Sequence, residues 1–310
     1  MRQFLLLGVF SVLLTALLVP QTASAQNYRF EAGFNVGGTN YLGDIGGKYL
    51  EGRNSIADIR LKQTSLAGGI YAKYALSPRL GIALSGLYGR IRGDDSLTTN
   101  PQRNARNLSF RNDIKQIALT LEYEIYEAYN IGRNTKYRID YSLYLLGGAS
   151  YFMHNPQAEY GGKWYDLQPL KTEGVNYSLT GISVLGGFGM DFTLDRNYKI
   201  GFKLMGNFTN TDHLDDISGK GLPRAGYTYD AAGNLAYALS DRRGEADPTY
   251  VRDPSIASLR GGGNNDAFIS ATLNFAYVFK GKGGKYNRAF HNGYIRKKGK
   301  RLGVSRFFAF

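Results

Sequence analysis

The sequence predicts an all-β fold: an eight-stranded antiparallel transmembrane β-barrel with long outer loops and a basic periplasmic C-terminal tail. Three observations lead to this prediction. Segments of about ten residues alternate between apolar and polar side chains, as strands with one lipid-facing side require. The connections between these segments are alternately short and long. The 310-residue chain is also rich in glycine and tyrosine and contains no cysteine, which suits a closed barrel that needs no disulfides.

The N-terminus is typical of an export signal. Arg2 precedes an apolar run over residues 4–19, and Ala23-Ser24-Ala25 supplies the small residues that a signal peptidase requires. We therefore expect residues 1–25 to be removed, residues 26–280 to form the barrel and residues 281–310 to form the tail. A membrane-anchoring helix is the alternative, but the apolar run is short and the cleavage site follows it directly. Later segments lack the apolar length of a spanning helix, which excludes a helical inner-membrane protein.

Alternation is clearest in the fourth strand. One face carries Ile117, Leu119, Leu121, Tyr123 and Ile125, and the other carries Gln116, Ala118, Thr120, Glu122 and Glu124. The same criterion, with weaker glycine-rich segments included, predicts strands at about residues 28–41, 64–76, 79–91, 116–125, 139–151, 178–194, 198–208 and 269–279. We interpret the glycine pairs Gly68-Gly69 and Gly186-Gly187 as bends where a small barrel curls tightly.

The predicted connections fall into two classes. The short ones lie at residues 77–78, 129–135 and 195–197. The long ones lie at residues 42–63, 92–108, 153–177 and 209–265. Because outer-membrane barrels have short periplasmic turns and longer outer loops, we expect an outer-membrane location with both termini in the periplasm. A soluble β-sandwich is the competing fold, but its loops need not alternate in length.

The net charge of +13 belongs mostly to the tail. Residues 281–310 contain nine Lys and Arg and no acid, including Arg296, Lys297, Lys298, Lys300 and Arg301. The export signal takes this tail away from the cytoplasm, so we expect no nucleic-acid partner. A solvated, disordered end is one interpretation. Electrostatic docking to a periplasmic partner is the other.

Several charged residues fall on the inward faces of the predicted strands: Glu122, Glu124, Arg138, Asp140, Lys199 and Lys203. An eight-stranded barrel is just wide enough to be filled by side chains, and buried charges must pair. We therefore predict a salt-bridge network that plugs the lumen, rather than paired carboxylates for acid–base catalysis. His154, His213 and His291 lie in loops or the tail, and no serine-nucleophile motif surrounds them. We expect no enzyme activity, cofactor or metal.

Two acidic motifs remain in the outer loops. Asn40, Tyr41, Gly43 and Asp44 follow the first strand, and Asp212, Asp215 and Asp216 follow the seventh. Both strands flank the eighth in a closed barrel, so the motifs should lie close together at the outer rim. Ordinary turn chemistry is one interpretation. The other is an ion-paired or cation-bound cluster, using Arg242 and Arg243, that folds the long last loop over the barrel mouth.

These motifs resemble those of the PorG family, outer-membrane proteins of the type IX secretion system of Bacteroidota. The resemblance rests on the segments 40–44 and 211–218, with Arg242-Arg243 and Asn265-Asp266, and covers residues 28–280. His213 stands where an aromatic residue is expected. The resemblance implies a non-enzymatic role in protein transport and gliding motility. Its implied partners are outer-membrane lipids, a PorK-like ring lipoprotein and a PorN-like ring protein. The barrel would anchor the ring formed by these two proteins to the membrane. A small barrel of the OmpA or OmpW type, with an adhesive or solute-channel role, is the alternative.

Overall fold

The computed structural model describes residues 30–46, 60–77, 79–129, 131, 139–195, 197–218, 231–250 and 261–279. The expected signal peptide, the tail with its five basic docking residues, His291 and Arg138 lie outside these ranges. No helix within the described ranges is both long and apolar enough to cross a membrane.

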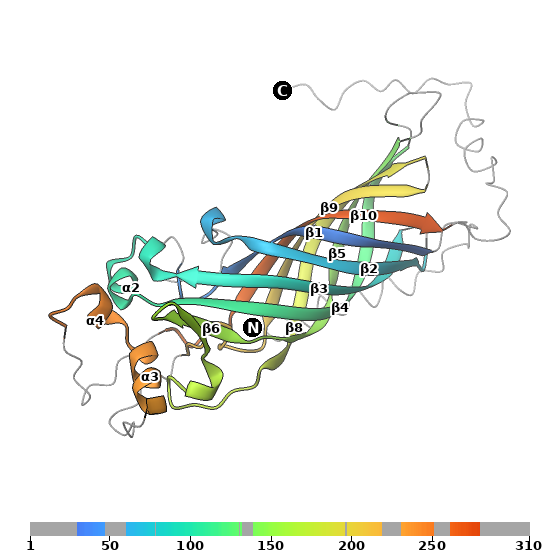
Figure 1. Cartoon of the computed structure of the whole chain (residues 1–310). Coiled ribbons are helices and arrows are strands. Elements are labelled where there is room, and N and C mark those ends of the chain that lie inside the picture. Colours follow the sequence, from blue (N-terminus) through green and yellow to red (C-terminus); the bar gives the residue numbers. More distant parts are fainter. Residues whose placement is uncertain are drawn as a thin grey trace, which may run out of the picture.

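Eight long antiparallel strands close into a barrel (Figure 1). They are β1 (Phe30–Leu42), β2 (Ser65–Ala75), β3 (Leu80–Asp94), β4 (Ser109–Ala128), β5 (Ile139–Met153), β8 (Thr180–Leu194), β9 (Tyr198–Thr209) and β10 (Ala267–Phe279). Each strand pairs with the next of the eight along the chain, and β1 pairs with β10 from Phe30↔Phe279 to Leu42↔Ala267. The predicted eight-stranded antiparallel fold is confirmed.

Side-chain exposure follows the predicted alternation. On β4, Ile117 is 62% exposed and Leu119 53%, whereas Thr120 is 4% exposed and Glu122 2%. The outward face of the barrel is thus an apolar surface around a polar, filled interior. Because unpaired backbone groups are costly in lipid, a closed antiparallel barrel with such a surface is the β architecture that crosses an outer membrane.

Two glycines allow the sheet to curl this tightly. An ideal Cβ on Gly69 would lie 2.1 Å from the carbonyl oxygen of Gly86 on the next strand, and one on Gly187 would lie 2.1 Å from that of Leu204. Any other residue would push the neighbouring strand away. These contacts show close approach of neighbouring strands at one glycine of each pair, and the interpretation of the pairs as bends stays a prediction.

The described residues of the four long connections lie at one end of the barrel, the loop end, and those of the short connections lie at the opposite turn end (Figure 1). The long connections contain more structure than the sequence predicted: the hairpin β6 (Pro156–Tyr160) and β7 (Lys163–Asp166), α2 (Pro101–Arg106), α3 (Ala231–Ser240), α4 (Arg243–Ala246) and the 3-10 helices η2 (Leu61–Gln63), η3 (Asp95–Leu97) and η4 (Gln168–Leu170). These elements are too short for periodicity to reveal. The described residues of the four connections form what we call the loop cap.

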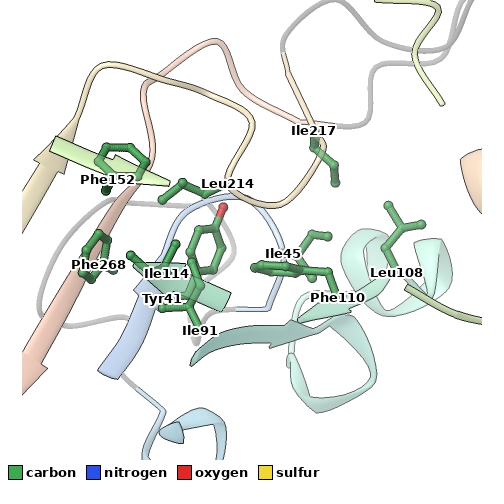
Figure 2. Packing of buried hydrophobic residues seen from close by; sticks show 10 residues of the cluster. All are labelled: Tyr41, Ile45, Ile91, Leu108, Phe110, Ile114, Phe152, Leu214, Ile217 and Phe268. Carbon is green, nitrogen blue, oxygen red and sulfur yellow. The ribbon is translucent and has the colours of Figure 1, made fainter. Parts of the chain in front are cut away.

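An apolar cluster fills the barrel mouth beneath the loop cap (Figure 2). It consists of Tyr41, Ile45, Ile91, Leu108, Phe110, Ile114, Phe152, Leu214, Ile217 and Phe268, each at most 4% exposed. Strand ends and three of the four long connections contribute to it. The connections are therefore packed into one body rather than spread over solvent, since burying this much apolar surface offsets the entropy of ordering them.

Candidate functional site

A cluster of aspartates surrounds the Tyr41 hydroxyl at the end of β1. Tyr41 Oη lies 2.6 Å from Asp266 Oδ1 and 2.8 Å from Asp215 Oδ2. The amide of Asp44 donates to the same oxygen at 3.1 Å. The side chains of Tyr41, Asp215 and Asp266 are buried. The first and last long connections therefore meet at a single phenol, which joins the two acidic motifs of the sequence.

Backbone amides orient the two carboxyl groups. Leu214 N donates to Asp266 Oδ2 at 2.9 Å, and Ile217 N donates to Asp215 Oδ1 at 3.0 Å. These bonds hold the segment 214–217 in the mouth, so that Leu214 and Ile217 enter the apolar cluster.

The geometry and burial of the cluster favour a proton shared by its two carboxyl groups. A phenol has one hydrogen, so it can donate to only one of the two carboxyl groups that it touches. Burial raises the pKa of Asp215 well above its usual range, with the Asp44 carboxylate adding to the rise. Burial, and then Asp215, raises the pKa of Asp266 in the same way. The raised pKa values favour the neutral form of the pair, in which one carboxyl group donates to Tyr41 Oη while Tyr41 donates to the other.

Gly43 makes room for this arrangement. An ideal Cβ at this position would lie 2.0 Å from Tyr41 Oη and 2.3 Å from Asp266 Oδ1. The glycine of the first motif thus permits the close approach of the phenol and the carboxyl group. Asn40 has a different role, because its Nδ2 donates to Arg60 O at 2.7 Å and to Thr64 Oγ1 at 3.0 Å.

Arginines of the second long connection pair with the first. Arg106 forms a bidentate ion pair with the fully buried Asp95, at 2.7 Å from Nε to Oδ2 and 3.0 Å from Nη2 to Oδ1. Arg106 also donates to Asp44 O at 2.8 Å, and Arg103 Nη2 lies 4.0 Å from Asp44 Oδ1. Burial raises the pKa of Asp44, and the Gly262 amide, 2.8 Å from Oδ2, opposes that rise.

The prediction that Arg242 and Arg243 pair with this cluster is wrong. Arg242 binds Glu245 at 2.8 Å and Ser109 Oγ at 3.1 Å, and Arg243 binds Asp241 at 2.7 Å. Both arginines are satisfied by neighbours within or beside α4. Arg103, Arg106 and Asp95 were missed because nothing in their sequence context marks them as partners of residues more than forty positions away.

The remaining acids of the second motif face the third long connection. Asp216 accepts hydrogen bonds from Thr172 Oγ1 and from Tyr177 Oη, the latter at 2.5 Å. The His213 ring stacks on Tyr177 with centroids 4.4 Å apart and an interplanar angle of 14°. Asp212 lies half-buried beside His213. The second motif therefore contacts two places: Asp215 bonds to Tyr41, whereas Asp216 and His213 contact the third long connection.

Within the described ranges, no group of three His, Cys, Asp or Glu side chains has the geometry to hold a metal ion. His154 is buried in the cap, with Nδ1 3.3 Å from Asn112 Nδ2 and Nε2 3.2 Å from the Ser178 carbonyl oxygen. Burial lowers its pKa to about 4, so it is neutral at pH 7. In that state Nε2 donates to Ser178 O and Nδ1 accepts from Asn112. His154 thus serves packing and hydrogen bonding.

Ion pairs fill the lumen toward the turn end. Glu122 forms an ion pair with Lys73 at 2.8 Å and accepts a hydrogen bond from Lys203 at 2.7 Å, and Lys73 lies 3.8 Å from Glu124. Lys199 binds Glu31 at 2.5 Å. Asp191, 4.0 Å from Lys199, completes this group. Of the predicted lumen residues, Glu122, Glu124, Lys199 and Lys203 are in these pairs, and Asp140 is half-buried at the start of β5.

Sequence reasoning missed Lys73, Glu31 and Asp191. All three lie on the glycine-rich strands whose alternation was weak, although the inward position of Lys73 could have been read from Tyr71 and Ala75 beside it. Nearer the loop end, amides and hydroxyls replace charges: Gln116 Nε2 donates at 2.7 Å to both Ser150 Oγ and Asn207 Oδ1. The interior is thus layered from ion pairs, through neutral polar groups, to the apolar cluster.

A protein-family model described as a domain of unknown function, DUF6089, matches residues 8–235. The chain belongs to the DUF6089 family. No curated protein matches it.

Several solved outer-membrane barrels are similar to this DUF6089 protein. The N-terminal β-barrel domain of Pseudomonas aeruginosa OprF is 10% identical, with a TM-score of 0.33 over 83% of this chain and 100% of that one. Ail of Yersinia pestis, in complex with a heparin analogue, is 11% identical, with a TM-score of 0.34 over 81% and 98%. Pseudomonas aeruginosa OprG is 12% identical, with a TM-score of 0.33 over 82% and 98%. The fold described above rests on the strand pairing alone.

Proposed function

We propose that this protein is a non-enzymatic, non-conducting barrel of the outer membrane that anchors a periplasmic assembly. The observation that carries the proposal is the filled interior. Buried ion pairs on Glu122 and Lys199, the Gln116 hydrogen bonds and the apolar cluster follow one another from the turn end to the loop end. Each layer draws on strands from several sides of the barrel. Such an interior favours a rigid plug over a general pore.

The nature of the assembly follows from the resemblance to the PorG family. The motifs that carry this resemblance form the cluster around the Tyr41 hydroxyl, which contains Tyr41, Gly43, Asp44, Asp215 and Asp266. We therefore propose that the chain is a component of the type IX protein secretion system, fastening a PorK/PorN-type ring to the outer membrane. Its periplasmic surfaces, the 129–135 turn and the basic tail 281–310, would make the contact.

A pull-down from mild-detergent outer membranes tests this proposal. The full-length tagged protein should recover ring lipoproteins and their partner, and a variant with Arg296, Lys297, Lys298, Lys300 and Arg301 changed to Ala should recover less. A deletion strain should lose secretion of cargo. Recovery of the barrel alone, together with intact secretion in the deletion strain, would refute the secretion role and leave the fold unaffected.

A small barrel of the OmpA or OmpW type with an adhesive or solute-channel role is the second candidate. The fold and the apolar outward surface fit it equally well. Planar bilayer recordings separate the two: an anchor stays closed, whereas a solute channel gives reproducible single-channel steps. Reproducible steps from the purified wild-type chain would favour the second candidate.

A further inference from the structure

The strands β3 and β4 stay paired with each other beyond the point where β2 stops pairing with β3. In Figure 1 they run on toward α2 at the loop end. Most of the charge here lies in three alternate residue pairs, the first just short of the extension and the other two within it. These pairs, which we call the cationic rungs, are Tyr88↔Lys115, Arg90↔Asp113 and Arg92↔Arg111.

All three rungs face outward. Between them, Ile91, Phe110 and Ile114 are at most 2% exposed and belong to the apolar cluster inside the mouth. Because successive side chains of a strand point to opposite faces, Arg92 and Arg111 must point away from the barrel. Lys115 is exposed in agreement with this alternation.

The rungs begin where the apolar outward surface ends. Ile117, the next outward residue of β4, is 62% exposed, and the neighbouring outward residues of β5 are Tyr151, 50% exposed, and Met153, 47% exposed. Tyr88, in the lowest rung, is itself 50% exposed. An exposed tyrosine pair at the edge of an apolar surface is typical of the membrane interface. The cations therefore lie at the level of lipid headgroups.

The positive charge of the rungs is only partly neutralised by the protein. Arg90 pairs with Asp113 at 2.5 Å. Arg92 and Arg111 lie directly opposite each other, an arrangement of like charges that destabilises a sheet. Within the described ranges, the side chain of Lys115 makes no hydrogen bond or ion pair. Four cations thus stand against one carboxylate over about 14 Å of strand.

Neutral groups fix the two facing arginines without removing their charge. Arg92 Nη2 donates to Lys62 O at 2.8 Å. Arg111 Nε donates to Gln157 Oε1 at 2.9 Å, and its guanidinium lies 3.8 Å from the centre of the Trp164 ring. Ordered guanidinium groups lose less entropy when they bind an anion. The facing arginines are therefore positioned to share one negatively charged group.

We propose that the cationic rungs bind the phosphate groups of a phosphorylated glycolipid in the outer leaflet, whose acyl chains lie on the apolar surface below. Arginine is suited to bidentate contact with phosphate, and each cation near an anionic membrane surface strengthens binding about fivefold. The next outward residue, Asp94, accepts from Ser96 N and ends the positive stretch. This inference rests on the proposed outer-membrane placement, with the loop end facing outward.

The test uses the purified full-length protein and the fluorescence of Trp164, the sole tryptophan of the chain. Lipid A carrying two phosphates is titrated against the wild type, and native mass spectrometry counts the bound lipids. The variants are Lys115→Glu and the double variant Arg111→Glu/Lys115→Glu. The matched control is Arg79→Glu, a charge reversal of an exposed residue in the short turn at the opposite end. Heat-modifiable migration in gels verifies that each variant is folded.

We expect saturable binding to the wild type and to Arg79→Glu. Binding should weaken roughly fivefold or more in Lys115→Glu and roughly 25-fold or more in the double variant. Equal affinity of the wild type and Lys115→Glu, absence of binding to the wild type, or equal binding of lipid A stripped of its phosphates would overturn the proposal. Displacement of lipid A by millimolar inorganic phosphate would instead indicate a site for free phosphate and contradict the lipid assignment.

Failure of the placement can be distinguished from failure of the lipid site. Lys115→Cys and Arg79→Cys each introduce a single thiol into a chain without cysteine. A membrane-impermeant maleimide applied to intact cells should label Lys115→Cys and spare Arg79→Cys. The reverse pattern would refute the outward placement of the loop end, whatever the titration with purified lipid shows.

Discussion

Replacing Tyr41 with phenylalanine should release the segment 214–217 from the barrel mouth. The change removes one oxygen atom, and with it the contacts at 2.6 Å to Asp266, 2.8 Å to Asp215 and 3.1 Å to Asp44 N. The phenyl ring still fills its place against Phe110, with which it makes an edge contact at 5.0 Å. The two carboxyl groups remain buried and lose their common partner.

The size of the effect follows from those contacts. A hydrogen bond to a charged group contributes about 1.5–3 kcal/mol, and a buried acceptor left unsatisfied costs about 1–3 kcal/mol. A proton bound between the two carboxyl groups, which their raised pKa values favour, offsets part of the loss. We therefore expect the cap to open more easily by about 2–3 kcal/mol, corresponding to an opening equilibrium roughly 30- to 200-fold larger.

Hydrogen–deuterium exchange measures this opening directly. The amides of Leu214 and Ile217 donate to Asp266 and Asp215, so their exchange should accelerate by that factor in Tyr41→Phe. Strand amides near Glu122, in the middle of the barrel, should exchange as in the wild type. Unchanged protection of the Leu214 and Ile217 amides would show that the phenol does not hold the cap closed.

Three further predictions concern the same interior. The pKa values of Asp215 and Asp266 are raised in the closed cap, so low pH favours closure. Protection of the Leu214 and Ile217 amides against exchange should therefore be full below the usual pKa range of aspartate, and it should fall as pH rises through the raised values. Asp215→Asn supplies a donor without a titratable proton and should flatten the pH dependence of exchange; an unchanged slope would contradict this. Glu122→Gln removes the partner of Lys73 and Lys203 and should destabilise the barrel by about 3–5 kcal/mol in urea titrations in lipid vesicles, against a smaller loss for Glu124→Gln, whose lysine lies 3.8 Å away. Gly43→Ala should make the cap sensitive to protease because its Cβ would collide with Tyr41 Oη, whereas Gly263→Ala, with no atom within 4 Å of its Cβ, should resist protease as the wild type does.

The barrel could be predicted from the sequence because a lipid-facing strand side requires apolar residues at every second position. In β4, for example, Ile117 and Leu119 point outward and Thr120 and Glu122 point inward, so alternate residues match the apolar and polar environments on the two sides of the strand. The turn positions followed from the same pattern. Where the inward residues are apolar the alternation disappears, as at Ile114 and Phe110, so the predicted strand began at residue 116 although β4 begins at Ser109.

The site was predictable only at the level of which loops meet. Closure of the barrel brings β1 and β9 to either side of β10, and this places Tyr41 near Asp215. Partners from the second loop, Arg106 and Asp95, depend on how α2 packs across the mouth, which no local rule determines. The assignment of Arg242 to the cluster was wrong because Arg242 forms a salt bridge with the nearby Glu245 instead.

Polarity inside the barrel varies with depth in a way that suits a fixed plug. The ion pairs of Glu122 lie in the buried interior of the strands, where the dielectric is low and an unpaired charge is costly. Separating these pairs to open a path would require another partner for each charge within the same narrow cross-section. At the loop end the apolar cluster lacks such constraints, but opening it exposes Phe152 and Phe268 to water. The two ends are therefore closed by different forces, electrostatic toward the turn end and hydrophobic at the loop end.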